Sequence, residues 1–211
     1  MLRVEAYERF KSRLFSGELK PGQFVTQREL AVLVGVPLGP AREAIQRLEF
    51  ESLVKVYPQR GIQITDLSAR LIREAYQLRA TLETGAVRHF AEGGNRAVVE
   101  RLLAQTRSVR ERAGDAITDA LRREAVEVDW AMHDAFVDSL ENTLFSEAYR
   151  VNAARIRLIR ASNLFSDERL LGVMDEHLAI LSACRDGKTS RAAKLLEAHL
   201  ATSRDRALRG V

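Results

Sequence analysis

Four residues in the second half of the chain have the side chains and the spacing of a metal site. Asp129 and His133 lie four residues apart in the segment VDWAMHDAFVDSL, residues 128–140. Apolar residues recur there at helical intervals, so the segment is predicted to be a helix with Asp129 and His133 stacked on one face, about 6 Å apart. Such a pair is an ordinary surface pair, two metal ligands, or a base with the acid that orients it.

His177 and His199 flank a predicted turn, RDGK at residues 185–188. His177 lies ten residues before Gly187 and His199 lies twelve after it. In an antiparallel helical hairpin, both imidazoles would therefore lie about 15–18 Å from the turn. If they share a face, they can converge with Asp129 and His133. Three imidazoles and a carboxylate suit Zn²⁺, Ni²⁺, Mn²⁺ or Fe²⁺. A single helical histidine is more often an ordinary core or surface residue, so spacing alone leaves that interpretation open.

The segment that must position these residues, 67–211, is predicted to be an all-α bundle. No strand-like alternation persists after residue 66, and no proline occurs after Pro58. Amphipathic patterns separated by short loops indicate about six helices. They cover residues 67–92, 95–114, 117–140, 142–162, 168–187 and 188–210. The fold class is therefore mainly α.

The first 66 residues are predicted to form a winged helix-turn-helix. A first helix precedes SGELKPG, a second begins after Thr26 with a capping box completed by Glu29, and a third begins near Pro40, which suits the first helical position. A short glycine- and proline-containing connection joins the last two, as in a helix-turn-helix. Alternating residues around PQRG, residues 58–61, predict a two-stranded wing. The domain boundary is placed at 66/67.

Several residues of this segment could contact DNA. Arg42 and Arg47 lie on the polar side of the predicted recognition helix, and Gln59 and Arg60 lie at the wing tip, where they suit phosphate or the minor groove.

Residues 16–64 resemble the DNA-binding domain of the GntR family of bacterial transcription regulators. The shared motifs are G-x-L-x-P-G, REL, P-x-REA-x-x-x-LE and the wing glycine. The resemblance implies that Arg28, Arg42 and Gly61 occupy DNA-contacting positions. The family usually has Ser-Arg-Ser/Thr just before the recognition-helix proline, whereas this chain has Pro37, Leu38 and Gly39. An arginine contact worth roughly 1–3 kcal/mol is thus replaced by Leu38, which implies an unusual operator or weaker binding.

Residues 67–211 resemble the FCD effector domain of the FadR-like branch of these regulators. The family marks are Arg-x3-Glu, Asp-x3-His and two later histidines. They are matched by Arg79–Glu83, Asp129–His133, His177 and His199, whereas His89 matches none. The resemblance implies that Asp129 and the three histidines bind a divalent metal (Zn, Ni or Mn) that holds a small carboxylate effector. Arg79 and Arg206 match effector-contacting positions, and Asn152 is a further candidate. A bidentate guanidinium suits a carboxylate.

Composition excludes several classes of protein. The net charge of +4 is spread evenly, with 10 basic against 8 acidic residues in 1–66, so any DNA contact must come from local arginines. With one cysteine, Cys184, no internal disulfide can form, which fits the cytoplasm. No apolar run is long enough to span a membrane, and no secretory signal is evident.

These observations predict a ligand-responsive transcription regulator that is not an enzyme. The interpretation is a homodimeric repressor that binds a palindromic double-stranded operator. The alternatives are a hydrolase-type enzyme in which the metal activates water, a direct metal sensor, and a DNA-binding protein whose metal only stabilises the bundle.

Overall fold

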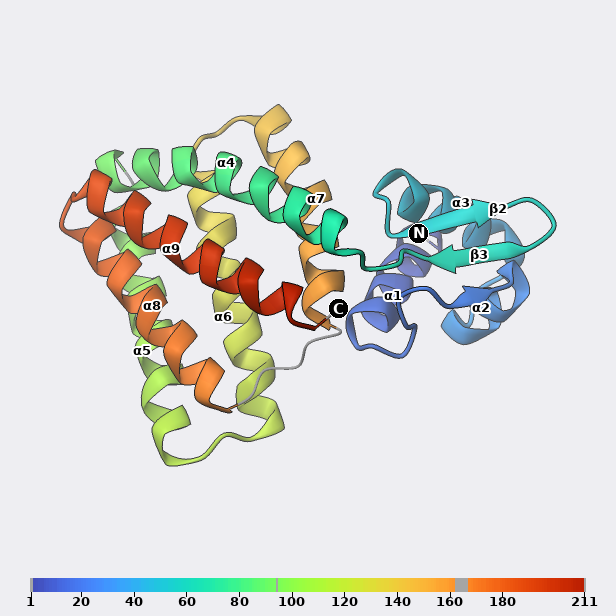
Figure 1. The fold of residues 1–211 in the computed structure, drawn as a ribbon, viewed down its shortest axis with the longest axis horizontal. Coiled ribbons are helices and arrows are strands. Elements are labelled where there is room, and N and C mark those ends of the chain that lie inside the picture. Colours follow the sequence, from blue (N-terminus) through green and yellow to red (C-terminus); the bar gives the residue numbers. More distant parts are fainter. Residues whose placement is uncertain (1, 94, 162–166, 211) are drawn as a thin grey trace. The chain divides into compact units, whose positions relative to one another are not determined.

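The computed structural model describes residues 2–93, 95–161 and 167–210 (Figure 1). The chain divides into two compact units. The first contains residues 1–75, 150–164 and 206–211, and the second contains residues 76–149 and 165–205. Helices α4, α7 and α9 each contribute residues to both units.

The first unit contains the three predicted helices α1 (Leu2–Phe15), α2 (Gln27–Val34) and α3 (Leu38–Phe50), of which α2 and α3 form the helix-turn-helix. Thr26 caps α2, and Glu29 completes the capping box. Gly35 ends α2 with a φ of 64°, a left-handed conformation that glycine adopts without a steric penalty. The apolar face of α3, including Ile45 and Leu48, is buried.

The start of α3 differs from the prediction. The helix begins at Leu38 with Pro37 as its N-cap, so the placement of Pro40 at the first helical position is wrong. The first four N–H groups of a helix have no partner within it, so a proline is also tolerated at the third position.

The wing belongs to a three-stranded antiparallel sheet of order β1-β3-β2. Strands β2 (Val54–Tyr57) and β3 (Gly61–Ile64) are the predicted hairpin and are visible as paired arrows (Figure 1). Strand β1 (Phe24–Val25) was not predicted, because two residues are too few to show strand alternation. Phe24 pairs with Gln63, and Val25 with Ile62.

Six further helices follow in the described part of the chain, which confirms the predicted number. They are α4 (Ala69–Gly93), α5 (Arg96–Asp115), α6 (Asp119–Asp138), α7 (Thr143–Ala161), α8 (Asp167–Arg185) and α9 (Thr189–Leu208). Side chains of α5, α6 and α8, among them Val109, Val128 and Met174, form a buried apolar cluster in the second unit. Helices α8 and α9 run back along each other after the turn at Gly187 (Figure 1). None of the described helices is both long and apolar enough to cross a membrane.

Candidate metal centre and DNA-binding face

Helices α6, α8 and α9 bring the four predicted ligands together. Each of Asp129, His133, His177 and His199 offers one ligand atom, and these atoms lie within 4.8 Å of one another. The four side chains are at most 5% exposed. Asp129 and His133 are indeed stacked on α6, and the α8–α9 hairpin places His177 Nε2 only 3.4 Å from His199 Nε2.

A buried carboxylate sets the tautomer of His133. Glu83 Oε2 lies 2.6 Å from His133 Nδ1, and Glu83 Oε1 accepts a 2.7 Å hydrogen bond from Arg79 Nε. Burial by itself would raise the pKa of Glu83, but the Arg79 guanidinium and His133 lower it to about 2. The ionised carboxylate only accepts, so Nδ1 carries a proton, and in the neutral imidazole the lone pair is then on Nε2. Within the described residues, this buried Nε2 has no hydrogen-bond partner.

His199 is oriented in the same way by α8. Its Nδ1 lies 2.6 Å from Glu176 Oε2, which leaves Nε2 facing the cluster. Burial lowers the pKa of His199, and the neutral imidazole is the form that binds a metal. Histidine ligands typically donate their second ring N–H to a carboxylate in this manner. Glu83 and Glu176 therefore have the positions of outer carboxylates around a metal centre.

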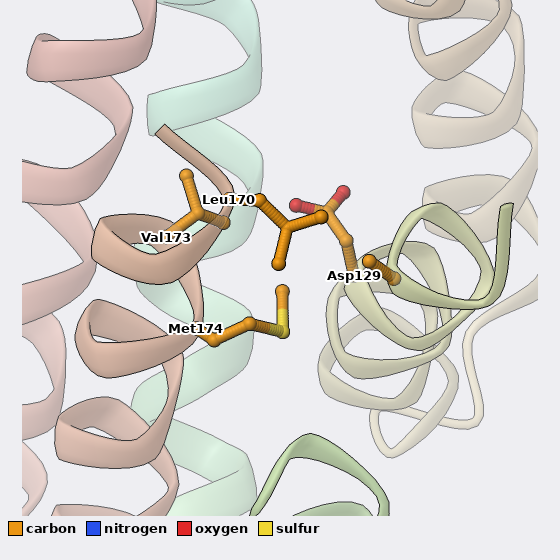
Figure 2. A pocket seen from close by; sticks show the side chains of 5 residues that line it. Asp129, Leu170, Val173 and Met174 are labelled. Carbon is orange, nitrogen blue, oxygen red and sulfur yellow. The ribbon is translucent and has the colours of Figure 1, made fainter. Parts of the chain in front are cut away.

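One side of the Asp129 side chain faces apolar residues. Its side chain borders a small cavity lined by Ala125, Leu170, Val173 and Met174 (Figure 2). One carboxylate oxygen, Oδ1, lies 3.5 Å from His177 Nε2. The set of one carboxylate oxygen and three imidazole nitrogens suits Zn²⁺ or a neighbouring transition metal. The residues present therefore fit a divalent metal.

Arg79 adds anion-binding capacity to this network. Arg79 is 1% exposed, and its guanidinium carbon lies 5.4 Å from the centroid of the Trp130 ring. Although burial disfavours its charge, Glu83 and then other groups, including Asp129, raise the pKa of Arg79, so it remains cationic. Nε is used by Glu83, whereas Nη1 and Nη2 have no hydrogen-bond partner among the described residues. Two adjacent buried donors of this kind match the two oxygens of a carboxylate.

The other two predicted effector residues belong to the first unit, whereas the four-residue cluster belongs to the second. Asn152 is buried, donates from Nδ2 to the Ala75 carbonyl at 2.9 Å, and has no partner for Oδ1 in the described ranges. Arg206 lies in the last turn of α9 and is partly exposed. Their contact with an effector stays a prediction.

The predicted DNA-contacting arginines occupy exposed positions around the helix-turn-helix. Arg28 lies in the first turn of α2 and Arg60 at the wing tip. Arg42, in the first half of α3, donates from Nε to Gln27 Oε1 at 3.1 Å. This bond fixes Arg42 relative to α2 and does not use its Nη groups. Exposed arginines here fit a helix-turn-helix that inserts α3 into the major groove.

Arg47 and Gly61 have structural contacts that the sequence did not reveal. The Arg47 guanidinium lies over the Tyr7 ring at 3.8 Å, and its Nε is 3.4 Å from Glu51, which accepts a 2.6 Å hydrogen bond from Tyr7. Gly61 has a φ of 100°, and a Cβ there would lie 2.8 Å from the Val25 carbonyl oxygen. Glycine is therefore required for β3 to pair with β1. Direct DNA contact by either residue stays a prediction.

Comparison with protein families identifies the chain. The FCD domain model matches residues 74–202, and the model for the gntR family of bacterial regulatory proteins matches residues 2–64. The chain is a GntR-family transcription regulator with an FCD domain. The gntR match contains the resemblance over residues 16–64, and the FCD match covers residues 74–202 of the resemblance over 67–211, which leaves Arg206 outside it. Neither family is a family of enzymes.

Two curated relatives of this GntR protein extend over most of its length. The HTH-type transcriptional regulator YdhC of Bacillus subtilis is 27% identical over 90% of the chain and 84% of its own length. The HTH-type transcriptional repressor GlaR of Escherichia coli is 26% identical over 94% of the chain and 92% of its own length.

Solved structures share the fold of this regulator. A GntR regulator from Rhodococcus sp. RHA1 covers 98% of the chain and 97% of its own, with a TM-score of 0.80 and 20% identity. The Zn²⁺-bound FCD domain of TM0439 covers 68% of the chain and 95% of its own, with a TM-score of 0.50 and 19% identity. An FCD domain can therefore bind metal, as TM0439 does.

Proposed function

We propose that this transcription regulator is a cytoplasmic homodimeric repressor whose FCD domain binds a divalent metal and, with it, a small carboxylate effector. The observation that carries the proposal is the convergence of Asp129, His133, His177 and His199 beside Arg79, whose Nη1 and Nη2 have no partner among the described residues. The four-residue cluster has the ligand atoms for a cation, and Arg79 has the hydrogen-bond donors for an anion.

The metal would be held by Asp129, His133, His177 and His199. Glu83 and Glu176 support this assignment, because they direct the Nε2 lone pairs of His133 and His199 into the cluster. When bound, the metal supplies a Lewis-acidic centre for carboxylate or hydroxyl oxygen. We expect Zn²⁺, Ni²⁺ or Mn²⁺ to fit this mixed nitrogen and oxygen site.

Arg79 would hold the effector carboxylate. Its charge is preserved by Glu83, and its two Nη groups present parallel donors. An apolar ligand would leave these donors buried and unsatisfied, which costs about 1–3 kcal/mol. The site therefore favours an anion. Asn152 and Arg206 are proposed as further effector-binding residues.

The DNA-binding role is proposed for residues 1–66, and the metal and effector role for residues 67–211. In a homodimer, two copies of α3 would enter successive major grooves about 34–36 Å apart, which requires a palindromic operator. The effector would change operator affinity only if it binds the DNA-bound and free conformations with different affinity. GlaR, a relative that is a repressor, supports repression as the outcome.

The first test is the metal content of purified tag-free protein by elemental mass spectrometry. We expect about one ion per chain in the wild type and a clear loss in His177→Ala. His89→Ala is the matched control, because His89 is an exposed histidine outside the cluster. If neither the wild type nor His89→Ala binds metal after incubation with Zn²⁺, Ni²⁺ and Mn²⁺, the metal centre is refuted.

The second test separates an effector regulator from a direct metal sensor. Acetate, lactate, malate and citrate are titrated into metal-loaded protein by calorimetry, and operator affinity is then measured with and without each binder. We expect one of them to bind in an Arg79-dependent way and to change operator affinity. If metal removal alone changes operator affinity, and no carboxylate does, the protein is a metal sensor instead.

A further inference from the structure

We infer that Leu38 reads a thymine methyl group in the operator, and so determines base specificity. This inference rests on the proposed function, since it assumes that α3 enters the major groove of operator DNA. Leu38 is the first residue of α3, the second helix of the helix-turn-helix. In this motif the N-terminal residues of the second helix contact base edges. Leu38 therefore lies at a position that contacts the base edges of DNA in this motif.

The chemistry of Leu38 restricts what it can read. An aliphatic side chain has neither donor nor acceptor, so it cannot recognise a base through a hydrogen bond. In the major groove the apolar feature of a base edge is the C5 methyl group of thymine. Although apolar, Leu38 is 38% exposed. A base contact would remove this apolar surface from water, which is favourable.

The surroundings of Leu38 allow close approach of a base. A Cβ added at Gly39 would meet no atom within 4 Å, so the surface beside Leu38 is open. Gly39 itself therefore places no side chain between Leu38 and a base.

Arg42 lies on the same face of α3 and provides a second DNA contact from which the position of the Leu38 contact can be located. It lies four residues after Leu38, so the two side chains are neighbours along α3. The bond from Arg42 Nε to Gln27 Oε1 fixes the arginine and leaves its Nη groups for guanine or phosphate. We expect the thymine read by Leu38 to lie at a fixed offset from the Arg42 contact, once in each half-site.

The test uses a pool of random DNA duplexes from which the wild-type protein selects its preferred sites. Each thymine in one half-site of a selected duplex is then replaced by deoxyuridine, which removes only the C5 methyl group. We expect one position at which this change weakens binding by about fourfold, the effect of one buried methyl-sized group. At that position 5-methylcytosine should be preferred over cytosine.

Variants assign the effect to Leu38. Leu38→Ala should bind the thymine and deoxyuridine duplexes equally, and Leu38→Arg should select a different base there. Phe50→Ala is the control, since Phe50 is an exposed apolar residue at the other end of α3 and should keep the methyl preference. Circular dichroism checks that the variants fold.

The outcomes distinguish this inference from the proposed function. If the wild type selects a defined site but tolerates deoxyuridine at every thymine, the inference about Leu38 is overturned and DNA binding stands. The same holds if Leu38→Ala keeps the methyl preference. If the wild type, with or without added metal, selects no site at all, the proposed operator binding fails as well.

Discussion

Two arginine–glutamate pairs on α4 have the same spacing and length but opposite surroundings. Arg70 and Glu74 lie four residues apart, as do Arg79 and Glu83, and in each pair Nε lies 2.7 Å from Oε1. The side chains are 84% and 57% exposed in the first pair, but 2% and 0% exposed in the second. Water can replace either partner of the first pair and neither partner of the second. Burial, not geometry, therefore decides which of the two pairs contributes to the stability of the fold.

The same difference in burial separates the DNA-binding face from the candidate metal centre. The DNA-binding face consists of exposed side chains on α2, α3 and the wing, which can rearrange around a partner at little cost. The candidate metal centre consists of buried polar groups that must be satisfied together. Substitutions should therefore have small effects on folding in the first region and large ones in the second.

The largest effect is expected for Arg79→Ala in metal-free protein. Its removal leaves the Glu83 carboxylate buried without its main partner, so the free energy of unfolding should fall by about 3–5 kcal/mol. Urea denaturation measures this change. Arg70→Ala, the matched exposed variant, should unfold like the wild type. Equal losses in both variants would mean that burial does not distinguish the pairs.

Metal removal should have the next largest effect. A metal present at 100–1,000 times its dissociation constant stabilises the folded state by about 2.7–4.1 kcal/mol. Treatment with a chelator should therefore lower the melting temperature of loaded protein by roughly 5–15 °C. His89→Ala should lose the same amount. His177→Ala should already melt at the lower temperature and respond little to the chelator; a full response would remove His177 from the centre.

The two outer carboxylates allow a finer comparison within the buried region. Glu83→Gln and Glu176→Gln keep the side-chain shape but remove the charge that orients a histidine. Loss of such a partner weakens metal binding by about 10–100-fold. We expect Glu83→Gln to lie near the upper end and Glu176→Gln near the lower, because Glu83 is fully buried and Glu176 is 33% exposed. Competition with a chelating dye gives both affinities, and the reverse order would contradict the argument from burial.

The smallest effect concerns the wing. Gly61→Ala places a Cβ against the Val25 carbonyl in a backbone conformation that alanine disfavours, which should cost about 1–2 kcal/mol of stability. Operator affinity should fall with it, as the wing loses its pairing with β1. Gly39→Ala is the control, since a Cβ at Gly39 meets nothing. Unchanged stability in Gly61→Ala would show that β1 and β3 separate easily.

Much of the candidate centre followed from the sequence because its ligands lie on regular helices. The interval between Asp129 and His133 fixes their shared face, and the position of the turn places His177 and His199 at the same height. Helical periodicity relates residues over many turns, so spacing showed that these four could converge, and the resemblance to FCD domains singled them out as a ligand set.

The outer residues could not be found in the same way. Glu176 lies next to His177 in a charged stretch that is typical of a solvated surface, yet it contacts His199 on another helix. Glu83 was expected only as the partner of Arg79, and its second bond, to His133, joins α4 to α6. The stacking of Arg47 on Tyr7 likewise joins α3 to α1. Such contacts depend on how two helices pack together, and the spacing of residues along one helix does not predict that packing.

The unequal exposure of the two outer carboxylates gives the candidate metal centre an inner and an outer edge. Glu83, behind His133, is sealed from water, whereas Glu176, behind His199, is one-third exposed. In the proposed centre, water and protons reach the Glu176–His199 edge first, so this edge would open when an ion enters or leaves. The residence time of the ion would then be set by how often that one imidazole swings away. In the proposed centre, metal would then enter and leave from this one side.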